Sequence, residues 1–332
     1  MSESARHRID PGTPFQGLTP EVLLQAVDRL GFQTDGRLLA LNSYENRVYQ
    51  INLEDADPVV AKFYRPRRLS DAAILEEHAF ALEAASLELP VVPPMVVDGH
   101  SLFSHQGFRY AVFRRQGGHW PELGTAADRV LMGRFLGRLH ILGELRRFEH
   151  RPSLDLMDTL ERAAHEVLDS GRLPDHQVDR YEQLCEQILE TIDLCQQRVG
   201  SWRSLRVHGD CHRGNVLWTA QGPHFVDLDD AINGPAVADV WMLLAGSRDE
   251  MRAQWSDLLE GYEQFRAFPR HEWSLIPALK LTRIVHYSAW ILRRFNDPAF
   301  PKAFPWFESA RYWEEHIHTL SDEWATLRHF SE

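Results

Sequence analysis

Cysteine is scarce in this sequence. The 332 residues include three, Cys185, Cys195 and Cys211, and no two of them have the C-x-x-C spacing. Disulfide scaffolds carry an even and dense set of cysteines, so this sparse and odd set argues against one. We therefore expect a protein of a reducing compartment, that is, a cytoplasmic protein.

Long apolar runs are lacking as well. Residues 1–14 are polar and contain Pro11 and Pro14, so they do not have the apolar centre of a signal peptide. The most apolar late segment, 276–295, is interrupted by basic residues. Because a membrane-spanning helix needs about 20 consecutive apolar residues, we expect no membrane association.

Basic charge is too low for a nucleic-acid-binding protein. The sequence has 36 Lys and Arg residues against 48 Asp and Glu residues, a net charge of −12. Nucleic-acid-binding proteins usually need a basic surface that displaces phosphate counterions. The nearest basic run, Arg65-Pro66-Arg67-Arg68, is short and is balanced by Asp71, Glu76 and Glu77. We interpret this run as a solvated loop.

The patterns that are present divide the chain in two. Residues 1–16 resemble a loose tail, and residues 17–115 contain several strand-like runs with two helices. Gln116-Gly117-Gly118 is typical of a flexible joint, and residues 116–332 are mainly helical. We predict a small β-rich lobe and a larger helical lobe with a ligand-binding cleft between them.

Capping residues and apolar periodicity predict the individual elements. In the small lobe we expect helices at 19–31 and 70–86, and strands at 37–41, 47–51, 59–64, 95–97 and 110–113. In the large lobe we expect helices at 125–143, 153–164, 179–199 and from 237 onward, with a β segment at 205–230.

The segment with the clearest chemistry lies in this β segment. It contains HGDCHRGNVLW at 208–218 and FVDLDD at 225–230. Phosphoryl transfer needs a carboxylate for the attacking hydroxyl and hard oxygen ligands for Mg²⁺. Asp210 can be the carboxylate, and Asn215 and Asp227 can be the ligands, because a short hairpin would bring Asp227 back beside Asn215.

Two other interpretations of this segment are open. Asp, Asn and Gly are common in turns, so the segment could be a surface hairpin. Alternatively, His208, Cys211 and His212 could bind a softer metal such as zinc, although no further Cys/His cluster completes such a site.

The complete pattern, HGDxHxxN followed by VDLDD and GPxxxD, resembles the aminoglycoside-phosphotransferase and choline-kinase-like family. The resemblance implies an α+β, protein-kinase-like two-lobed fold with a small antiparallel-sheet lobe and a larger, mostly helical lobe. It also implies that Asp210 is the catalytic base and that Asp227 binds metal. In that family the last Asp of the pattern, here Asp239, braces the catalytic loop, and we expect His208 to support the loop as well.

The small lobe offers candidates for ATP binding. A kinase needs a strand lysine and a helix glutamate, and Lys62 in VVAKFY supplies the first. Glu76 and Glu77 are both candidates for the second, and we prefer Glu77 because it lies one turn from Ile74 and Ala81. Alternatively, Lys62 is an edge-strand lysine whose ammonium reaches water.

The expected phosphate loop, Asn42–Val48, lacks the G-x-G-x-x-G of protein kinases. Backbone N–H groups with Ser43 or Asn46 would then hold the phosphates of ATP. We expect ATP as co-substrate and Mg²⁺ as cofactor.

A bacterial branch of the same family is similar over most of the chain. The matching segments are 41–50, 62–66, 74–78, 208–212 and 297–302. Members of that branch are cytoplasmic Ser/Thr protein kinases that autophosphorylate and act under stress. The resemblance implies a protein acceptor with a Ser or Thr hydroxyl, and Ser43 at the ATP site; we also expect a monomer.

Two further functions are open. An acidic protein could favour a cationic small alcohol, such as an amino alcohol or an aminoglycoside, as acceptor. The aromatic-rich segment 290–313 would then wall its pocket, or the segment could pack the helical core. A nucleotide-binding regulator that transfers no phosphate is the other possibility.

Overall fold

A computed structural model describes residues 13–327, so the first twelve residues of the expected tail lie outside the described part of the chain. The small lobe contains α1 (Pro20–Asp28), β1 (Thr34–Ala40), β2 (Arg47–Leu53), β3 (Val59–Phe63), α2 (Asp71–Ser86), β4 (Phe103–His105) and β5 (Phe108–Arg114). Its strands form one antiparallel sheet of five strands in the order β1-β2-β3-β5-β4. The predicted small antiparallel-sheet lobe is therefore confirmed.

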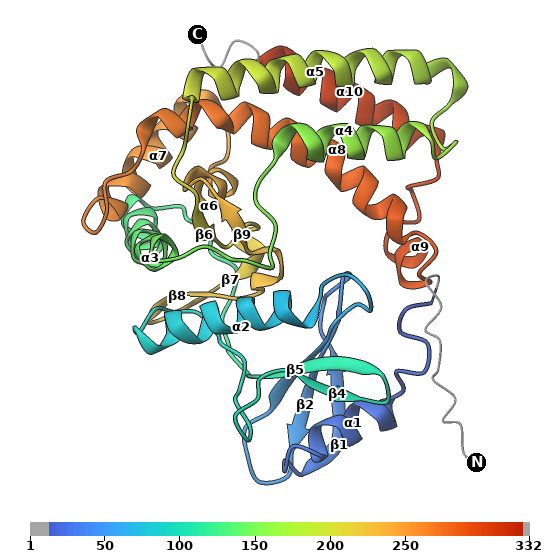
Figure 1. Cartoon of the computed structure of the whole chain (residues 1–332), viewed down its shortest axis with the longest axis vertical. Helices are drawn as coiled ribbons and strands as arrows, with labels where there is room; N and C mark the ends of the chain where they lie inside the picture. The colour runs from blue at the N-terminus through green and yellow to red at the C-terminus, as the bar shows by residue number, and fades with distance from the viewer. Residues whose placement is uncertain (1–12, 328–332) are drawn as a thin grey trace.

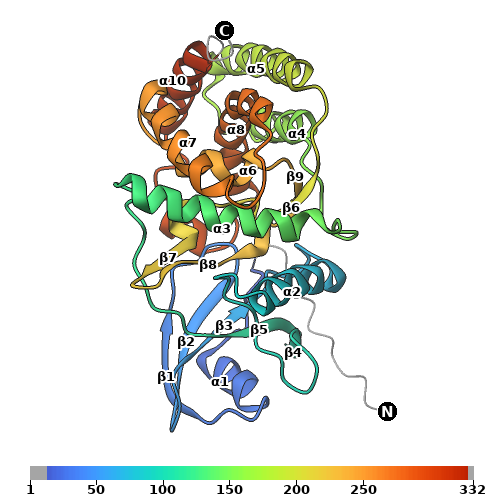
Figure 2. The ribbon, with the colours of Figure 1, turned by 90° about the vertical axis from the view of Figure 1, so that its left-hand side faces the viewer.

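The rest of the chain is mainly helical. Its α-helices in the described part of the chain are α3 (Ala126–Glu144), α4 (Leu156–Leu168), α5 (Val178–Val199), α6 (Val237–Val240), α7 (Arg248–Tyr262), α8 (Ile276–Arg294), α9 (Ala299–Ala303) and α10 (Ala310–Leu327). Figures 1 and 2 show the sheet at one end of the molecule and the helices at the other, with α3 crossing between them. The two-lobed kinase-like α+β fold is confirmed, and the boundary between the lobes after residue 115 stays a prediction.

Local sequence explains how the small lobe starts. The side chain of Thr19 accepts a hydrogen bond from Val22 N at 3.4 Å, and Pro20 fills the first position of α1, where a missing N–H costs nothing. The buried face of α1 packs on the sheet, whose own core includes the stacked rings of Phe63 and Tyr110. Burial of this face ties the helix to the sheet that carries Lys62.

Glycines bring α3 unusually close to its neighbours. A Cβ at Gly133 would lie 2.0 Å from the carbonyl oxygen of Leu258 in α7, and one at Gly143 would lie 2.2 Å from the carbonyl oxygen of Arg206. Only glycine permits such approach of two backbones. The helix therefore fixes both α7 and the short strand that contains Arg206, which leads into the candidate site.

Three short strands lie within the predicted β segment, 205–230, and a fourth follows directly after it. They are β6 (Leu205–Val207), β7 (Val216–Thr219), β8 (Gly222–Phe225) and β9 (Ile232–Gly234). β6 pairs with β9 and β7 pairs with β8, both antiparallel. The expected hairpin between residues 215 and 227 is thus present.

One predicted strand, 95–97, is wrong. Pro94 and Val97 make only isolated bridges, to Phe113 and His100, and no ladder continues from them. Pro93 and Pro94 have no N–H to donate, which limits pairing here. Across residues 13–327, every helix is too short or too polar to span a lipid bilayer.

Candidate active site

The two pairs of short strands bring the two motif segments, 208–218 and 225–230, together. The loop 208–215 joins β6 to β7, and the loop 226–231 joins β8 to β9. Val226 N donates to the carbonyl oxygen of Asn215 at 3.0 Å. The loop with Asp210 and the loop with Asp227 therefore lie side by side, as the sequence predicted for the hairpin.

Asp239, fully buried on α6, fixes the start of the first loop. Its carboxylate accepts hydrogen bonds from His208 N at 2.7 Å and from Gly209 N at 2.8 Å. His140 Nε2 donates to it at 3.1 Å. Burial alone would raise the pKa of Asp239, but the hydrogen bond and charge of His140 outweigh it and lower this pKa. The carboxylate therefore stays charged and holds two loop amides.

The ring of His208 connects the two loops. His208 Nε2 donates to the carbonyl oxygen of Val226 at 3.0 Å, and His208 Nδ1 accepts from Asp210 N at 3.4 Å. Gly209 has φ of 79°, and a Cβ there would lie 2.0 Å from the carbonyl oxygen of Asp230. Glycine is required at this position because the neighbouring loop passes so close.

Asp210 is held by three side chains. Oδ1 accepts from Arg283 Nη1 of α8 at 2.7 Å, and Oδ2 lies 3.3 Å from His212 Nε2 and 3.2 Å from Asn215 Nδ2. Burial would raise the pKa of Asp210, but the hydrogen bond from His212 and the charge of Arg283 hold it well below its usual range. The carboxylate is therefore ionised at neutral pH and fixed in orientation.

Asn215 and Asp227 present oxygens of the kind that hard cations prefer. The amide of Asn215 also donates to the backbone oxygen of Asp210 at 3.0 Å, which leaves its own oxygen without a protein partner among the described residues. Asp227 has a left-handed backbone with φ of 62°, and its side chain is 48% exposed. An amide oxygen and a carboxylate on adjacent loops fit a Mg²⁺ ion, which binds through one or two carboxylates together with substrate phosphates.

Lys62 of β3 is buried and reaches the same place from the small lobe. Its ammonium lies 2.8 Å from Asp227 Oδ1 and 2.6 Å from Asp229 Oδ1. Burial would lower the pKa of Lys62, but these two carboxylates outweigh it and raise this pKa. The alternative of a lysine whose ammonium reaches water is wrong, because the side chain is only 8% exposed.

The structure separates the two candidate glutamates of α2. Glu76 faces away from Lys62, and its oxygens accept from Glu149 N and His150 N at 2.7 and 2.8 Å. Glu77 is buried on the inner face, and burial raises its pKa to about 7 although Lys62 opposes the shift. In the described part of the chain, however, the ion pairs of Lys62 are with the two aspartates and not with Glu77.

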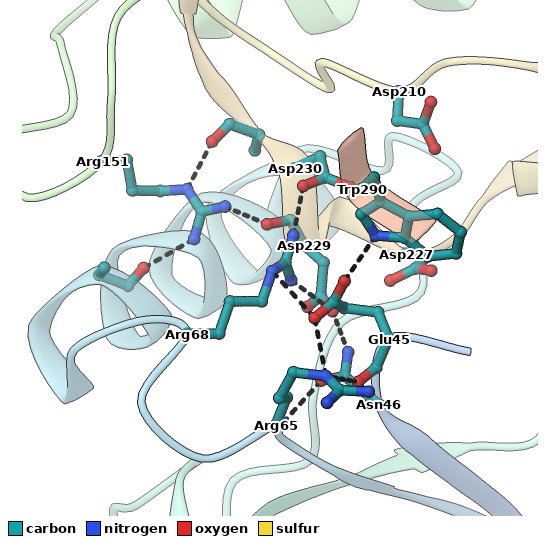
Figure 3. Close-up of polar contacts among 12 residues, drawn as sticks. Glu45, Asn46, Arg65, Arg68, Arg151, Asp210, Asp227, Asp229, Asp230 and Trp290 are labelled. Atoms are coloured by element: carbon teal, nitrogen blue, oxygen red, sulfur yellow. Dashed lines mark hydrogen bonds and ion pairs between the residues drawn. The ribbon is translucent and has the colours of Figure 1, made fainter. Parts of the chain in front are cut away.

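The loop 41–46, between β1 and β2, meets the large lobe at the same point. The side chain of Asn46 donates to Asp229 and accepts from Arg65 N at 2.9 Å, and Ser43 Oγ donates to the carbonyl oxygen of Asn46 at 3.4 Å. Figure 3 shows Glu45, Asn46, Asp229 and Asp230 in one polar network with Arg65 and Arg68. Both predicted phosphate-loop residues thus lie near Lys62 and Asp229.

Comparison with known proteins supports this picture. The model of the phosphotransferase enzyme family matches residues 37–274. The chain belongs to the phosphotransferase enzyme family. Stress response kinase A of Escherichia coli K12 is 41% identical over 318 residues, and the serine/threonine protein kinase RdoA of Salmonella typhimurium LT2 is 42% identical over 314 residues. Each alignment covers 95% of both chains.

Solved structures share the fold of this phosphotransferase at much lower identity. A microcompartment-associated aminopropanol kinase has a TM-score of 0.69 at 17% identity and covers 94% of this chain and 97% of its own. The amicoumacin kinase hAmiN, in complex with AMP-PNP, Ca²⁺ and Ami, has a TM-score of 0.65 at 17% identity and covers 89% of this chain and 93% of its own. These likenesses establish the fold.

The basic run Arg65–Arg68 of the phosphotransferase is not the solvated loop that its composition suggested. Arg65 is buried, and Arg68 contacts Glu45, Asp229 and Asp230 (Figure 3). Charge balance with nearby acids in the sequence was misleading, because the true partners lie far away along the chain.

Sequence reasoning missed other residues of the site. Arg151, Arg283 and Arg294 come from segments without a recognisable motif, whereas four others lie inside segments already singled out in the sequence, without a role being assigned to them: Glu45, Asp229, Asp230 and Asp297. Arg151, for example, donates to the backbone oxygens of Ala73, Asp229 and Ala231, which ties α2 to the second loop (Figure 3). The run Leu228-Asp229-Asp230 was quoted in the motif, so two of the aspartates could have been found from it.

The soft-metal interpretation finds no geometric support. In residues 13–327, no three His, Cys, Asp or Glu side chains are grouped to hold a metal ion. His208 Nε2 donates to the carbonyl oxygen of Val226, and His212 Nδ1 accepts from Gly214 N at 2.9 Å. Cys211 is fully buried in the core, where burial raises the pKa of its thiol.

Proposed function

We propose that the chain is a cytoplasmic Ser/Thr protein kinase that transfers the γ-phosphate of ATP to protein hydroxyls, its own included. One observation carries the proposal. Asp210, Asn215, Asp227 and Lys62 converge in a chain that is 41–42% identical to proteins named as stress response and Ser/Thr protein kinases.

Asp210 is proposed to receive and orient the acceptor hydroxyl. Its lowered pKa makes it a weak base at neutral pH. That suits phosphoryl transfer through a loose transition state, in which positioning of the nucleophile contributes more than early proton removal. Asp239 and His208 support this role by fixing the backbone around Asp210.

Asn215 and Asp227 are proposed to hold Mg²⁺, which supplies positive charge to the phosphates of ATP. Lys62 would neutralise the same phosphates. Its pairing with Asp227 and Asp229 keeps the ammonium charged and fixes its position. Ser43 and Asn46 would border the phosphates, with Glu77 as the buried acid beside Lys62.

The test compares acceptors in parallel. Pure protein is incubated with [γ-³²P]ATP and Mg²⁺, alone, with generic protein acceptors, and with a panel of amino alcohols and aminoglycosides. We expect label on Ser and Thr of the chain itself and of added proteins. Label confined to small alcohols would overturn the protein acceptor and keep the phosphotransferase, whereas no ATP turnover with any acceptor would favour a nucleotide-binding regulator.

A further inference from the structure

Helix α8 carries charge of one sign only. Between Ile276 and Arg294 it has Lys280, Arg283, His286, Arg293 and Arg294 and no acidic residue. The whole chain, by contrast, has a net charge of −12. A basic helix in an acidic protein therefore stands out as a local electrostatic feature.

Most of these side chains lie on one face of the helix. Six residues recur at spacings of three and four and form what we call the α8 stripe: Arg283, His286, Tyr287, Trp290, Arg293 and Arg294. Arg283, Tyr287 and Arg293 are exposed, whereas Leu281, Val285 and Ile291 are buried toward the core. Arg283, Tyr287 and Arg293 are therefore the exposed part of the stripe, whereas Trp290 and Arg294 are partly covered and contact Glu45.

The stripe connects the two ends of the candidate site. At one end Arg283 Nη1 lies 2.7 Å from Asp210 Oδ1. At the other end Trp290 Nε1 donates to Glu45 of the small lobe at 2.8 Å, and Arg294 Nε lies 2.6 Å from the same carboxylate. A helix rises about 1.5 Å per residue, so the stripe is roughly 16 Å long, about five residues of an extended peptide.

His286 lies among the arginines of the stripe. His286 contacts Arg293, and burial together with the charges of Arg293, Arg294, Arg283 and Arg162 lowers the pKa of His286 to about 4. The histidine is therefore neutral near pH 7, and the arginines supply the charge of the stripe.

Each arginine of the stripe has a carboxylate partner, which is Asp210 for Arg283, Glu166 for Arg293 and Glu45 for Arg294, but the partner of Arg283 is special. Arg283 is paired with Asp210, the residue that an acceptor hydroxyl must reach under the proposed function. A hydroxyl that donates a hydrogen bond to Oδ1 shares this oxygen with Arg283, whose guanidinium has further N–H groups to donate. Its side chain is 46% exposed, so it is free to turn to an anionic group on the acceptor.

We propose that the α8 stripe binds an acidic segment of a protein acceptor, next to the Ser or Thr that receives the phosphate. This inference rests on the proposed protein-kinase function and adds the substrate class. Arg283 contacts the acidic residue nearest the acceptor hydroxyl, and Arg293 contacts one further along. The stacked rings of Tyr287 and Trp290, 5.8 Å apart, lie between them and contact the peptide chain.

The experiment uses the full-length protein and two peptides with one Ser each, flanked by Asp and Glu in one and by Lys and Arg in the other. We expect a higher kcat/KM for the acidic peptide, and the preference should shrink when NaCl is raised, because salt screens exposed charges. Arg293→Ala should lower kcat/KM for the acidic peptide about two- to fivefold, the contribution of one exposed charge pair, and leave the basic peptide unchanged.

Matched controls separate this effect from general damage. Arg270→Ala removes an arginine that, like Arg293, is exposed and pairs with a glutamate at 2.6 Å, and it should change neither peptide. Arg283→Ala also removes a contact of Asp210 and can lower activity on both peptides. For this variant we therefore compare only the ratio of kcat/KM for the acidic peptide to kcat/KM for the basic peptide, and that ratio should fall.

Two outcomes overturn the inference alone: equal kcat/KM for both peptides, or a preference that persists in Arg283→Ala and Arg293→Ala. In either case phosphate still reaches a peptide serine, and the protein-kinase function stands. Label on small alcohols and on no peptide or protein overturns the proposed function and the inference with it.

Discussion

At the scale of single residues, Asp210 is the side chain whose loss should matter most. Asp210→Asn keeps the shape and the contact with Asn215 but removes the charge that receives the hydroxyl proton. We expect kcat for phosphate transfer to fall by at least about 10²-fold, the lower end for a general base. ATP binding should persist, measured by equilibrium titration, and activity within a few-fold of wild type would contradict the assignment.

The two proposed metal ligands should contribute unequally to Mg²⁺ binding. Asp227→Ala removes a full charge from the cation site and also one partner of Lys62, whereas Asn215→Ala removes a neutral oxygen. We expect both variants to need more Mg²⁺ for half-maximal activity, with the larger shift in Asp227→Ala. An unchanged Mg²⁺ titration in Asp227→Ala would exclude it as a ligand.

Glu272 gives a prediction about stability and pH. It is fully buried, Oε2 accepts from Val237 N at 3.0 Å, and Oε1 has no hydrogen-bond partner among the described residues. Burial raises its pKa from 4.5 to about 7. Because the folded state binds this proton more tightly than the unfolded state, the contribution to stability is complete below pH 4.5 and is lost as pH rises through 7.

The measurement is denaturant unfolding between pH 4.5 and 8 for wild type and Glu272→Gln. A pKa difference of this size corresponds to on the order of 3 kcal/mol. Over this pH range, the free energy of unfolding of wild type should therefore fall by up to that amount more than that of Glu272→Gln. Glutamine keeps the acceptor for Val237 N and does not titrate. Parallel curves for the two proteins would show that Glu272 does not titrate with this shift.

A site residue could be predicted from the sequence when the residues that it contacts lie close to it in the chain. Asp210, Asn215 and Asp227 lie within one short hairpin, so spacing alone placed them side by side. Arg283 contacts Asp210 from 73 positions further along the chain, on a helix with no motif. Its role depends on how α8 packs against the large lobe, which the sequence did not specify.

At the scale of elements, capping and periodicity predicted helices such as α1 and α3, because these signals are confined to a few neighbouring residues. Strand pairing was harder to predict from the sequence. Residues 95–97 look extended, and Met95 N donates to the carbonyl oxygen of Val112 at 2.7 Å. No ladder continues from this bond, because the preceding Pro93 and Pro94 have no N–H to donate. β4 has only three residues and is stabilised by pairing with β5, so its own sequence carried little signal.

The contact between α3 and α7 can be tested through one glycine. A Cβ at Gly261 would lie 1.9 Å from the carbonyl oxygen of Val130, so Gly261→Ala forces the two helices apart. Overpacking of this kind costs at least about 1–3 kcal/mol, which should lower Tm by several degrees. Gly124→Ala is the control, since a Cβ there meets nothing within 4 Å. Equal Tm values for the two variants would contradict the close contact.

At the scale of the whole molecule, the two lobes are joined by charge. The carboxylate of Asp297, just after α8, accepts from Arg47 Nη2 at 3.0 Å and from Arg65 Nη2 at 2.8 Å, and both arginines belong to the small lobe. Asp297 is only 4% exposed. This pairing holds the loop with Ser43 and Asn46 against the large lobe, beside Lys62 and Asp229, in the arrangement that nucleotide binding would use.

Asp297→Asn should therefore weaken nucleotide binding from a distance. The amide removes the charge that pairs with Arg47 and Arg65 but keeps the oxygen that accepts from Ala299 N at 3.1 Å, so the start of α9 is preserved. ATP is expected to bind when the loop with Ser43 and Asn46 is held against the large lobe. In Asp297→Asn fewer molecules have this arrangement, so the apparent KM for ATP should rise, on the order of tenfold for a typical coupling energy, with kcat less affected. Amide hydrogens of residues 42–48 should also exchange faster.

Asp158→Asn, which disrupts an exposed pair with Arg162 on α4, should change neither the KM for ATP nor the exchange rate. An unchanged KM together with faster exchange would show that the loop opens without consequence for ATP, and unchanged exchange would show that Asp297 does not hold the lobes together.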